Sequence, residues 1–167
     1  MIYEPRWYAL YTRPRFEKKV VELLLEQQYE AWLPLHKVVR QWSDRKKKVE
    51  VPLFNGYVFI RIPKNGIYEA VQTDGVARVV RFQGEPAPIR DDQIELIRKI
   101  LIGPDAFEVT ETSFTRGDLV RVTDGPLKGH EGRWVNWRGK KRVTIELDHI
   151  HHVLLVEVPA VYIEKID

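Results

Sequence analysis

The glycine-rich stretch at residues 122–132, VTDGPLKGHEG, most limits what the second half of this chain can fold into. It places Gly125, Gly129 and Gly132 between two runs of residues that favour β-strand. A phosphate-binding glycine loop would open a helix, whose N-terminus then faces the anion. Here the residues after Gly132 are RWVNW, which predict a strand. The glycines therefore indicate a sharp bend that needs positive φ or close backbone approach, and not a phosphate site.

Beyond residue 115 the chain favours short strands at close spacing. The runs expected to form them are residues 118–122, 132–137, 142–147, 153–158 and 161–166. Such a series, with glycines in the turns, is typical of a small barrel. The β-branched residues within these runs add to the preference for strand, so we expect the barrel to be stable.

The earlier part of the chain alternates between strand and helix patterns. Asn55-Gly56 is a strong turn signal, and Pro34 indicates an edge or bulged strand. The runs expected as strands are 7–11, 31–42, 49–54, 57–62 and 76–82, with helices from about residue 14, over 67–72 and from Asp91. This alternation predicts an α+β domain followed by an all-β domain.

The distribution of charge also indicates two domains. Residues 1–102 carry 18 lysines and arginines against 13 acidic residues, whereas residues 103–167 carry 9 against 11. Between the two patterns, residues 103–114 (GPDAFEVTETSF) have no clear period and indicate a linker. We therefore expect a basic domain at 1–102, a linker at 103–114 and a mildly acidic barrel at 115–167, with any nucleic acid on the first domain.

The residue types exclude several classes of function. The chain contains no cysteine, which excludes disulfides and thiol catalysis and suits a reducing cytoplasm. We expect no signal peptide and no membrane span, because no apolar run is long enough. His149, His151 and His152 alternate between the faces of a strand, which argues against a shared metal ion. With no catalytic pattern in the sequence, we expect a cytoplasmic binding protein that is not an enzyme and has no cofactor.

Aromatic residues gather around the first strand and the Asn-Gly turn. They are Trp7, Tyr8, Tyr11, Phe54, Tyr57 and Phe59. Alternation along a strand means that some of them belong to the core, and any single ring could do so. As a set, the three tyrosines favour a surface with an apolar body and hydrogen-bonding tips, which is typical of protein-binding hot spots.

Two groups of basic residues are candidate nucleic-acid contacts. The first, at the start of the first helix, comprises Arg13, Arg15, Lys18 and Lys19. Cations at a helix N-terminus oppose its dipole at about 0.3–1 kcal/mol each, which favours a binding role over a solvated face. The second group lies beside Trp42, in the hairpin expected from the strands at 31–42 and 49–54. It comprises Lys37, Arg40, Arg45, Lys46, Lys47 and Lys48. Its lysines either follow a phosphate backbone or prevent edge-to-edge association of strands, and both interpretations stay open.

Several motifs resemble the NusG family of transcription factors. The stretches WYALYTRPRFEKKVVELLLEQ, VPLFNGYVFIRI and TDGVARVVRF look like its N-terminal domain, and the glycine pattern from Gly117 to Gly132 resembles the KOW motif. The resemblance covers residues 6–102 and 115–166. It implies an N-terminal ferredoxin-like α/β sandwich followed by a small five-stranded SH3-like β-barrel. The hairpin and the C-terminal stretch look more like the specialised members of polysaccharide loci than like housekeeping NusG.

This resemblance implies a transcription elongation and antitermination factor that suppresses pausing and termination at particular operons. The family grips the clamp helices of RNA polymerase in a hydrophobic cavity, and its motifs place there Tyr11, Phe54, Tyr57 and Phe59. Trp7 is assigned to the core. In the specialised members, the surface that matches Arg13 and Arg15 reads exposed non-template DNA of the transcription bubble.

The barrels of this family commonly dock on ribosomal protein S10 or on the termination factor Rho. NusG carries an aromatic residue followed by glycine in the hairpin that makes these contacts, where this chain has Leu147-Asp148. The difference argues against Rho and leaves ribosomal protein S10 open; we expect a monomer. The alternative function is a KOW-type RNA-binding or ribosome-associated protein that does not act on polymerase. An exposed aromatic cavity separates the two functions, because an RNA binder needs no deep apolar site.

Overall fold

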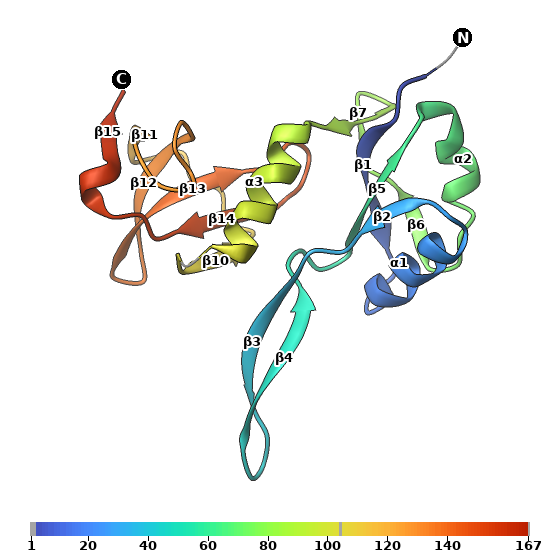
Figure 1. Ribbon diagram of the computed structural model, residues 1–167, viewed down its shortest axis with the longest axis horizontal. Helices are drawn as coiled ribbons and strands as arrows, with labels where there is room; N and C mark the ends of the chain where they lie inside the picture. Colours follow the sequence, from blue (N-terminus) through green and yellow to red (C-terminus); the bar gives the residue numbers. More distant parts are fainter. Residues whose placement is uncertain (1–2, 104, 167) are drawn as a thin grey trace. The chain divides into compact units, whose positions relative to one another are not determined.

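The computed structural model describes residues 3–103 and 105–166 of the chain (Figure 1). The chain divides into two compact units, Met1–Asp91 and Asp92–Asp167, which are called the first and the second unit below. This boundary precedes the one expected at residue 102, because the last helix groups with the second unit. Within the described residues, none of the helices has the length and apolar character needed to cross a membrane.

The first unit is built on an antiparallel sheet with the strand order β2-β5-β1-β6, and β9 also pairs with β1. Its strands are β1 (Arg6–Thr12), β2 (Glu30–Trp32), β5 (Tyr57–Ile62), β6 (Val76–Val79) and β9 (Pro88–Ile89). Helix α1 (Glu17–Glu26) lies between β1 and β2 in the chain, and α2 (Ile67–Ala70) lies between β5 and β6. A β-α-β-β-α-β order in an antiparallel sheet is the ferredoxin-like arrangement, which the resemblance to the NusG family implies.

Both helices of the first unit contribute to one hydrophobic core. Leu10 of β1 and Ile60 of β5 pack in this core with Val20 and Leu24 of α1 and Ile67 of α2. Each of these side chains is at most 5% exposed. Val20 and Leu24 lie four positions apart, so α1 buries one face while its other faces remain in water.

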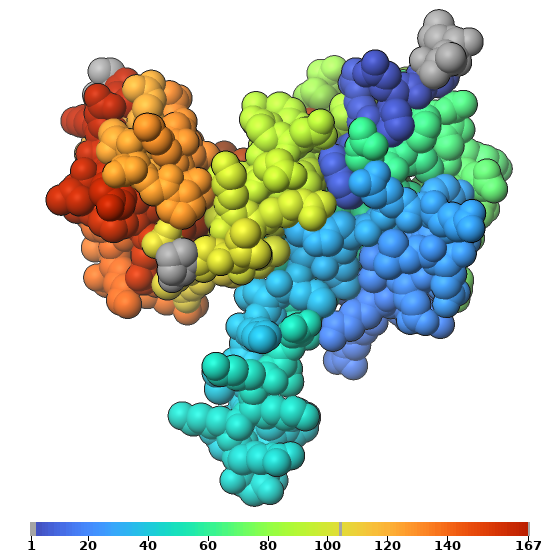
Figure 2. All heavy atoms as spheres, viewed as in Figure 1, coloured from blue at the N-terminus to red at the C-terminus, as the bar shows by residue number. Residues whose placement is uncertain are grey.

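A separate two-stranded hairpin is formed by β3 (Leu35–Gln41) and β4 (Lys46–Pro52). The expected strand over residues 31–42 is divided at Pro34, because proline has no N–H group to donate to a ladder. The hairpin projects from the rest of the first unit (Figures 1 and 2). A short hairpin of β7 (Arg81–Phe82) and β8 (Glu85–Pro86) and the 3-10 helix η1 (Lys64–Gly66) complete this unit.

The second unit contains most of α3 (Asp91–Ile102) and a six-stranded antiparallel sheet in the order β10-β14-β13-β12-β11-β15. Its strands are β10 (Phe107–Thr110), β11 (Asp118–Val122), β12 (Glu131–Trp137), β13 (Lys140–Glu146), β14 (Val153–Val156) and β15 (Ile163–Lys165), with the 3-10 helix η2 (Ala160–Tyr162) before the last. Val120 and Val122 are the buried residues of β11, and in β13 the four consecutive residues 142–145 are buried. The five strands expected after residue 115 are present, and η2 replaces the first half of the one expected at 161–166.

The sixth strand, β10, lies within residues 103–114, where the sequence predicts a linker. Its four residues pair with β14, with Phe107 opposite Val156 and Thr110 opposite Val153. So short a strand gives too few alternations to be recognised from periodicity, and its existence depends on the partner strand.

The glycines between β11 and β12 have the two roles that the sequence predicts. Gly125 and Gly129 have φ angles of +85° and +90°. At Gly132 a Cβ atom would lie 2.2 Å from the carbonyl oxygen of Thr144, so the backbone approach itself requires glycine. The next element is the strand β12 and not a helix, which agrees with a bend without a phosphate site.

Candidate functional site

One face of the first-unit sheet carries aromatic side chains. β1 and β5 pair so that Tyr11 lies opposite Tyr57, and Phe59 follows two residues further along β5. Cross-strand partners share a face, so these three rings lie together, whereas Leu10 points to the core formed with α1 and α2. Trp7 lies on the aromatic face and is 6% exposed, in agreement with its assignment to the core.

The rings contact one another in two groups, Tyr11 with Tyr57, and Phe59 with both Phe54 and Trp32. The ring centroids of Tyr11 and Tyr57 are 5.0 Å apart, those of Phe54 and Phe59 are 6.2 Å apart, and those of Phe59 and Trp32 are 5.9 Å apart. These separations are in the range of favourable aromatic pairs. We call these five residues the aromatic cluster. Trp32 is absent from the set predicted from sequence, because only the register of β2 against β5 places it opposite Phe59.

Exposure differs within the aromatic cluster. Phe54 is 1% exposed, Phe59 is 0% exposed and Tyr57 is 5% exposed. Tyr11 is partly exposed, and the guanidinium carbon of Arg78 lies 4.6 Å from the centroid of its ring. The four residues predicted from sequence therefore meet in one place, as mostly buried rings with Tyr11 at the accessible edge. The expected exposed cavity is not observed, so the exposure of these rings does not separate polymerase binding from RNA binding.

The turn that carries Phe54 and Tyr57 is fastened by Glu17, the first residue of α1. Glu17 is 5% exposed, and its Oε2 accepts a hydrogen bond from the N–H of Gly56 at 3.0 Å. The carbonyl oxygen of Gly56 in turn accepts from the N–H of Thr12 at 2.9 Å. A carboxylate in the first turn of a helix also suits the helix dipole. The sequence gives no local signal for this role, because Glu17 and Gly56 are 39 residues apart.

Arg13 is held in place by two neighbours at the basic start of α1. Its guanidinium forms an ion pair with Asp74 at 3.0 Å and lies 4.3 Å from the centroid of the Phe16 ring. The pair is exposed, so it adds little stability, but it fixes the direction in which Arg13 points. A nucleic acid that binds Arg13 has to compete with Asp74.

The other three predicted cations of this region are also exposed. Lys18 donates a hydrogen bond to the carbonyl oxygen of Glu50 at 3.0 Å, which joins α1 to strand β4 of the hairpin. Arg15 has a φ of +67°, an uncommon conformation for a residue with a side chain. Lys19 follows on the exposed side of the helix. The structure therefore brings this group and the base of the hairpin together.

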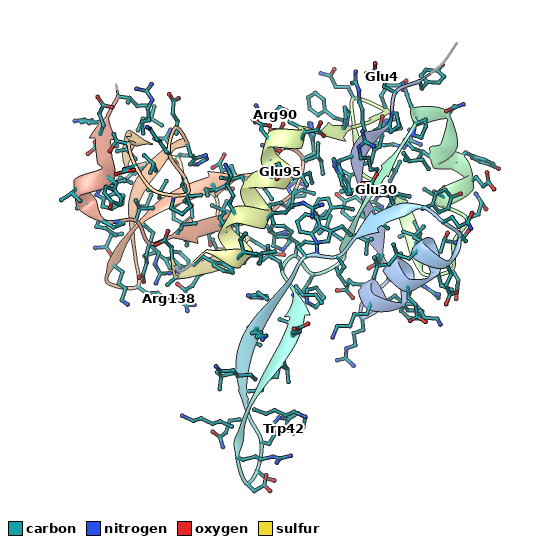
Figure 3. All side chains as sticks on the ribbon, in the orientation of Figure 1. Glu4, Glu30, Trp42, Arg90, Glu95 and Arg138 are labelled. Atoms are coloured by element: carbon teal, nitrogen blue, oxygen red, sulfur yellow. The ribbon has the colours of Figure 1, made fainter. Side chains whose placement is uncertain are left out.

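The hairpin itself carries a dense group of exposed cations at Arg45, Lys46, Lys47 and Lys48. Arg40 of β3 lies directly opposite Lys47 of β4. Like charges in this position destabilise a two-stranded ribbon, so the stability of the hairpin does not account for them. Trp42, near the tip, is 53% exposed (Figure 3). An exposed indole beside cations can stack on a base while the cations neutralise phosphates.

Cations in the second unit are matched by acids. Arg138, labelled in Figure 3, and Arg142 both contact Glu108 of β10, the former at 3.3 Å. Arg142 and Lys140 contact Glu157 at 3.2 Å and 3.4 Å. These pairs leave the turn between β12 and β13 with less unbalanced charge for RNA than its sequence indicates.

In the second unit His152 is buried and His130 is partly buried. Burial is the main reason that the pKa of His130 lies below the ordinary value of 6.5, although its hydrogen bond to the carbonyl oxygen of Thr144 opposes this change. Burial likewise lowers the pKa of His152 against the opposing effect of Glu111. Across residues 3–103 and 105–166, no three histidine, aspartate or glutamate side chains come together as a set of metal ligands.

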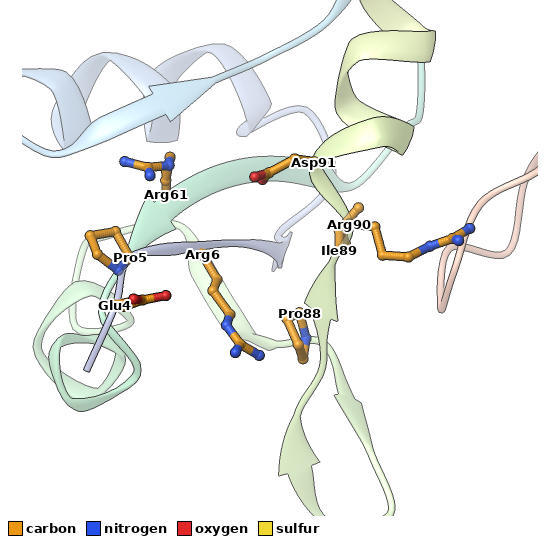
Figure 4. A pocket seen from close by; sticks show the side chains of 8 residues that line it. All are labelled: Glu4, Pro5, Arg6, Arg61, Pro88, Ile89, Arg90 and Asp91. Atoms are coloured by element: carbon orange, nitrogen blue, oxygen red, sulfur yellow. The ribbon is translucent and has the colours of Figure 1, made fainter. Parts of the chain in front are cut away.

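A pocket of about 490 Å³ in the first unit mixes charges of both signs (Figure 4). Its charged lining residues are Glu4, Arg6, Arg61, Arg90 and Asp91. The side chain of Arg90 points away from the others in Figure 4, and Arg61 is paired with Glu30 at 3.4 Å. The arginines do not converge on one point, and no residue predicted for binding lines this pocket.

Comparison with known proteins connects this site to a family. The profile described as "Transcription termination factor nusG" matches residues 5–98. The transcription termination/antitermination protein NusG of Pseudomonas aeruginosa is 28% identical over 177 aligned positions, covering 96% of this chain and 98% of that protein. The corresponding protein of Yersinia pestis is 30% identical over 141 positions, covering 76% and 77%. The structure of Thermotoga maritima NusG matches with a TM-score of 0.61 at 22% identity and covers 98% of each chain.

The family profile spans more than half of the chain, and it includes β1, α1 and the turn with Phe54 and Tyr57. This chain belongs to the NusG family. The match to the Thermotoga maritima structure supports the fold, including the presence of both the α+β part and the β-rich part.

Proposed function

We propose that this protein is a transcription elongation and antitermination factor that binds the clamp helices of RNA polymerase through the aromatic cluster. The observation that carries the proposal is the assembly of five rings from β1, β2, β5 and the preceding turn, on the sheet face opposite the core with α1 and α2. The relatives supply the context, since they are named for transcription termination and antitermination.

Tyr11 makes the first contact in this proposal. It combines an accessible aromatic ring with a hydroxyl group, and Tyr57 supports it from the side at 5.0 Å. The buried phenylalanines give the site a fixed shape, which lowers the entropy lost on binding. A protein that binds the active state of polymerase better than the paused state shifts the population toward elongation, without chemistry of its own.

Non-template DNA is the proposed nucleic-acid partner of the first unit. The hydrogen bond from Lys18 to the carbonyl oxygen of Glu50 joins the start of α1 to the hairpin, and we propose that the two basic groups act together as one cationic surface. That surface comprises Arg13, Arg15, Lys18, Lys19, Arg45, Lys46, Lys47 and Lys48. Lysines and arginines on such a surface follow phosphates and position the protein, and sequence preference requires further contacts to bases.

We propose that the second unit does not bind Rho, which leaves ribosomal protein S10 as its candidate partner. Leu147, at the position where NusG has an aromatic residue, is 6% exposed and offers no prominent side chain. The alternative function, RNA binding by this unit, is disfavoured because Glu108 and Glu157 neutralise Arg138, Lys140 and Arg142. We place the protein in the cytoplasm, where transcription occurs. We propose that it acts as a monomer.

Single-round transcription with a cognate bacterial polymerase tests this function, on a template with a pause site followed by a terminator. Wild-type protein is expected to increase readthrough, and Tyr11→Ala is expected to abolish the increase. Loss of a hot-spot aromatic costs about 2 kcal/mol or more, which is roughly thirtyfold in affinity. Tyr3→Ala, which removes a 41% exposed tyrosine outside the cluster, is the matched control.

The arginine variant Arg13→Ala/Arg15→Ala separates polymerase binding from DNA recruitment. We expect it to retain affinity for free polymerase and to lose readthrough only on certain template sequences. If wild-type protein neither binds polymerase nor changes readthrough on any template, the proposal is wrong and RNA or ribosome binding takes its place.

A further inference from the structure

Strand β10 covers an edge of the second-unit sheet that would otherwise be open. It pairs with β14 in an antiparallel ladder from Phe107–Val156 to Thr110–Val153, and the carbonyl oxygen of Ala106 extends the contact by accepting from the N–H of Glu157 at 2.9 Å. On its other side β14 pairs with β13. Without β10, the row of N–H and C=O groups along one side of β14 has no ladder partner.

The covered strand is strongly apolar. β14 reads VLLV, and its four side chains are between 0% and 7% exposed. An open edge next to such a sequence is a template for pairing with an extended segment of another chain. The protein therefore has at this place the backbone groups that strand addition requires, on a strand whose apolar side chains are buried.

Glu108 shows that the edge of β14 favours a strand that carries a negative charge at this position. Its carboxylate is shared between Arg142, which is 7% exposed, and Arg138. Arg142 also contacts Glu157, so a second acid holds this arginine in position. Any strand that replaces β10 needs a carboxylate at this position, because a buried guanidinium loses much stability when one of its partners is removed.

The attachment of β10 is small. All four of its residues are partly exposed, and the strand ends where Thr110 Oγ1 accepts from the N–H of Thr112 at 3.1 Å. The chain then runs without helix or strand until β11 begins at Asp118. Elements with few buried contacts open at a lower free energy than the rest of a domain, which is the reason to expect that β10 opens before the other strands of this unit.

We propose that the β14 edge is a docking site for an extended apolar–acidic–apolar segment of a partner protein, and that β10 occupies this site in cis. The covering strand itself defines the partner chemistry: an antiparallel segment with a carboxylate between two apolar residues, as in Phe107-Glu108-Val109. Because β10 is tethered, its effective concentration is in the millimolar range or above, and a partner segment binds only when it outcompetes or displaces the tethered strand.

A labelled peptide with the sequence of residues 105–112, DAFEVTET, is the probe, and its binding to the full-length protein is followed by fluorescence anisotropy. Glu108→Ala weakens the tethered strand and leaves Arg142 in place, so it is expected to bind the peptide at least about tenfold more tightly than wild type. The same peptide with lysine at the position of Glu108 is expected to lose this gain. Glu146→Ala, which removes an exposed carboxylate of β13, is the matched control.

A reversible lock gives a second test. Thr110 lies opposite Val153, and the chain has no cysteine of its own, so Thr110→Cys/Val153→Cys forms a single disulfide across β10 and β14. In the Glu108→Ala background the oxidised lock is expected to abolish peptide binding, and reduction is expected to restore it. Glu108→Gln, which keeps the volume and an acceptor oxygen, replaces Glu108→Ala if the latter fails to fold.

Three outcomes would overturn the proposal. Absence of peptide binding to Glu108→Ala, with β14 amides protected from hydrogen exchange, would make β10 a permanent strand. Binding that persists in the oxidised lock would place the peptide elsewhere. Dimerisation of Glu108→Ala without peptide binding would mean that the edge takes β10 of a second copy and not a partner segment.

Discussion

The carboxylate of Glu17 is the residue-scale feature on which the proposed polymerase site most depends. It accepts a hydrogen bond from the N–H of Gly56 and thereby holds the turn between Phe54 and Tyr57 in place. The same residue begins α1, whose first turn carries the basic group. One side chain thus couples the aromatic and the basic parts of the first unit.

Glu17→Ala is expected to weaken polymerase binding about tenfold, because the N–H of Gly56 loses its partner at a cost of about 1–3 kcal/mol and the turn loosens. Glu17→Gln keeps an acceptor oxygen and is expected to restore most of the affinity. Affinity and the hydrogen exchange of the Gly56 amide are measured together, with the exposed Glu22→Ala of the same helix as control. Wild-type affinity in Glu17→Ala despite fast exchange at Gly56 would limit Glu17 to a structural role.

His130 makes the second unit sensitive to acid. Its pKa lies below 6.5 in the folded chain, chiefly through burial, so the unfolded chain binds the proton more readily. The stability that depends on neutral His130 is present above pH 6.5 and is lost as the pH falls through the lowered pKa. His152 acts in the same direction.

Urea unfolding between pH 7.5 and 5 should therefore show a falling free energy of unfolding for the second unit, and His130→Gln should flatten this dependence. The glutamine amide can still donate to the carbonyl oxygen of Thr144 but does not titrate. The remaining slope belongs to His152. An unchanged slope in His130→Gln would show that His130 is protonated equally in the folded and unfolded chains.

Among the elements, the bend between β11 and β12 requires glycine for two different reasons. Gly132→Ala is expected to cost about 3 kcal/mol or more, because a Cβ would lie 2.2 Å from the carbonyl oxygen of Thr144 and the strands have to separate. Gly129→Ala is expected to cost only about 1–2 kcal/mol, since its φ is positive but the space around it is open. Urea midpoints of the two variants measure the difference; equal losses would contradict it.

The hairpin of β3 and β4 carries three consecutive exposed lysines, Lys46, Lys47 and Lys48. Replacing Lys46, Lys47 and Lys48 by glutamine is expected to reduce the slope of log affinity against log salt for single-stranded DNA by about 2, because three phosphate contacts are lost. A matched triple change in the second unit, Lys128, Lys141 and Lys165 to glutamine, should leave the slope unchanged. Equal slopes in wild type and the hairpin variant would mean that these lysines only keep strand edges apart.

At the scale of the whole molecule, the structure divides the chain at Asp91 and Asp92, and this division can be tested. The fragment 92–167 contains α3 and β10 and is expected to fold as a monomer. The fragment 115–167, which the sequence alone defines as the barrel, lacks both elements and is expected to self-associate through the exposed edge of β14. Light scattering and urea unfolding compare them; a monomeric 115–167 of equal stability would show that β10 is dispensable.

Much of the fold could be predicted because its signals are local. Strand β5 and strand β11 have the bounds that their residue patterns predict, and α3 begins at Asp91 as expected. Pro34 and Asn55-Gly56 mark real breaks between strands, since proline and glycine act on the backbone where they stand. Helix α1 begins at Glu17, later than the start expected from the sequence at about residue 14.

The sequence by itself determined the order of strands and helices, the glycine-rich bend, the basic residues of the first unit and the resemblance to NusG. Only the tertiary structure decided that Trp32 joins the aromatic cluster, that Glu17 holds Gly56, and that β10 closes the edge of β14. It also decided which cations are neutralised, as when Glu108 meets Arg142. Glu17 and Gly56 are 39 residues apart, and Glu108 and Arg142 are 34 apart. Backbone preferences act within a few residues, whereas contacts at such separations depend on strand register and packing, which a local pattern does not encode.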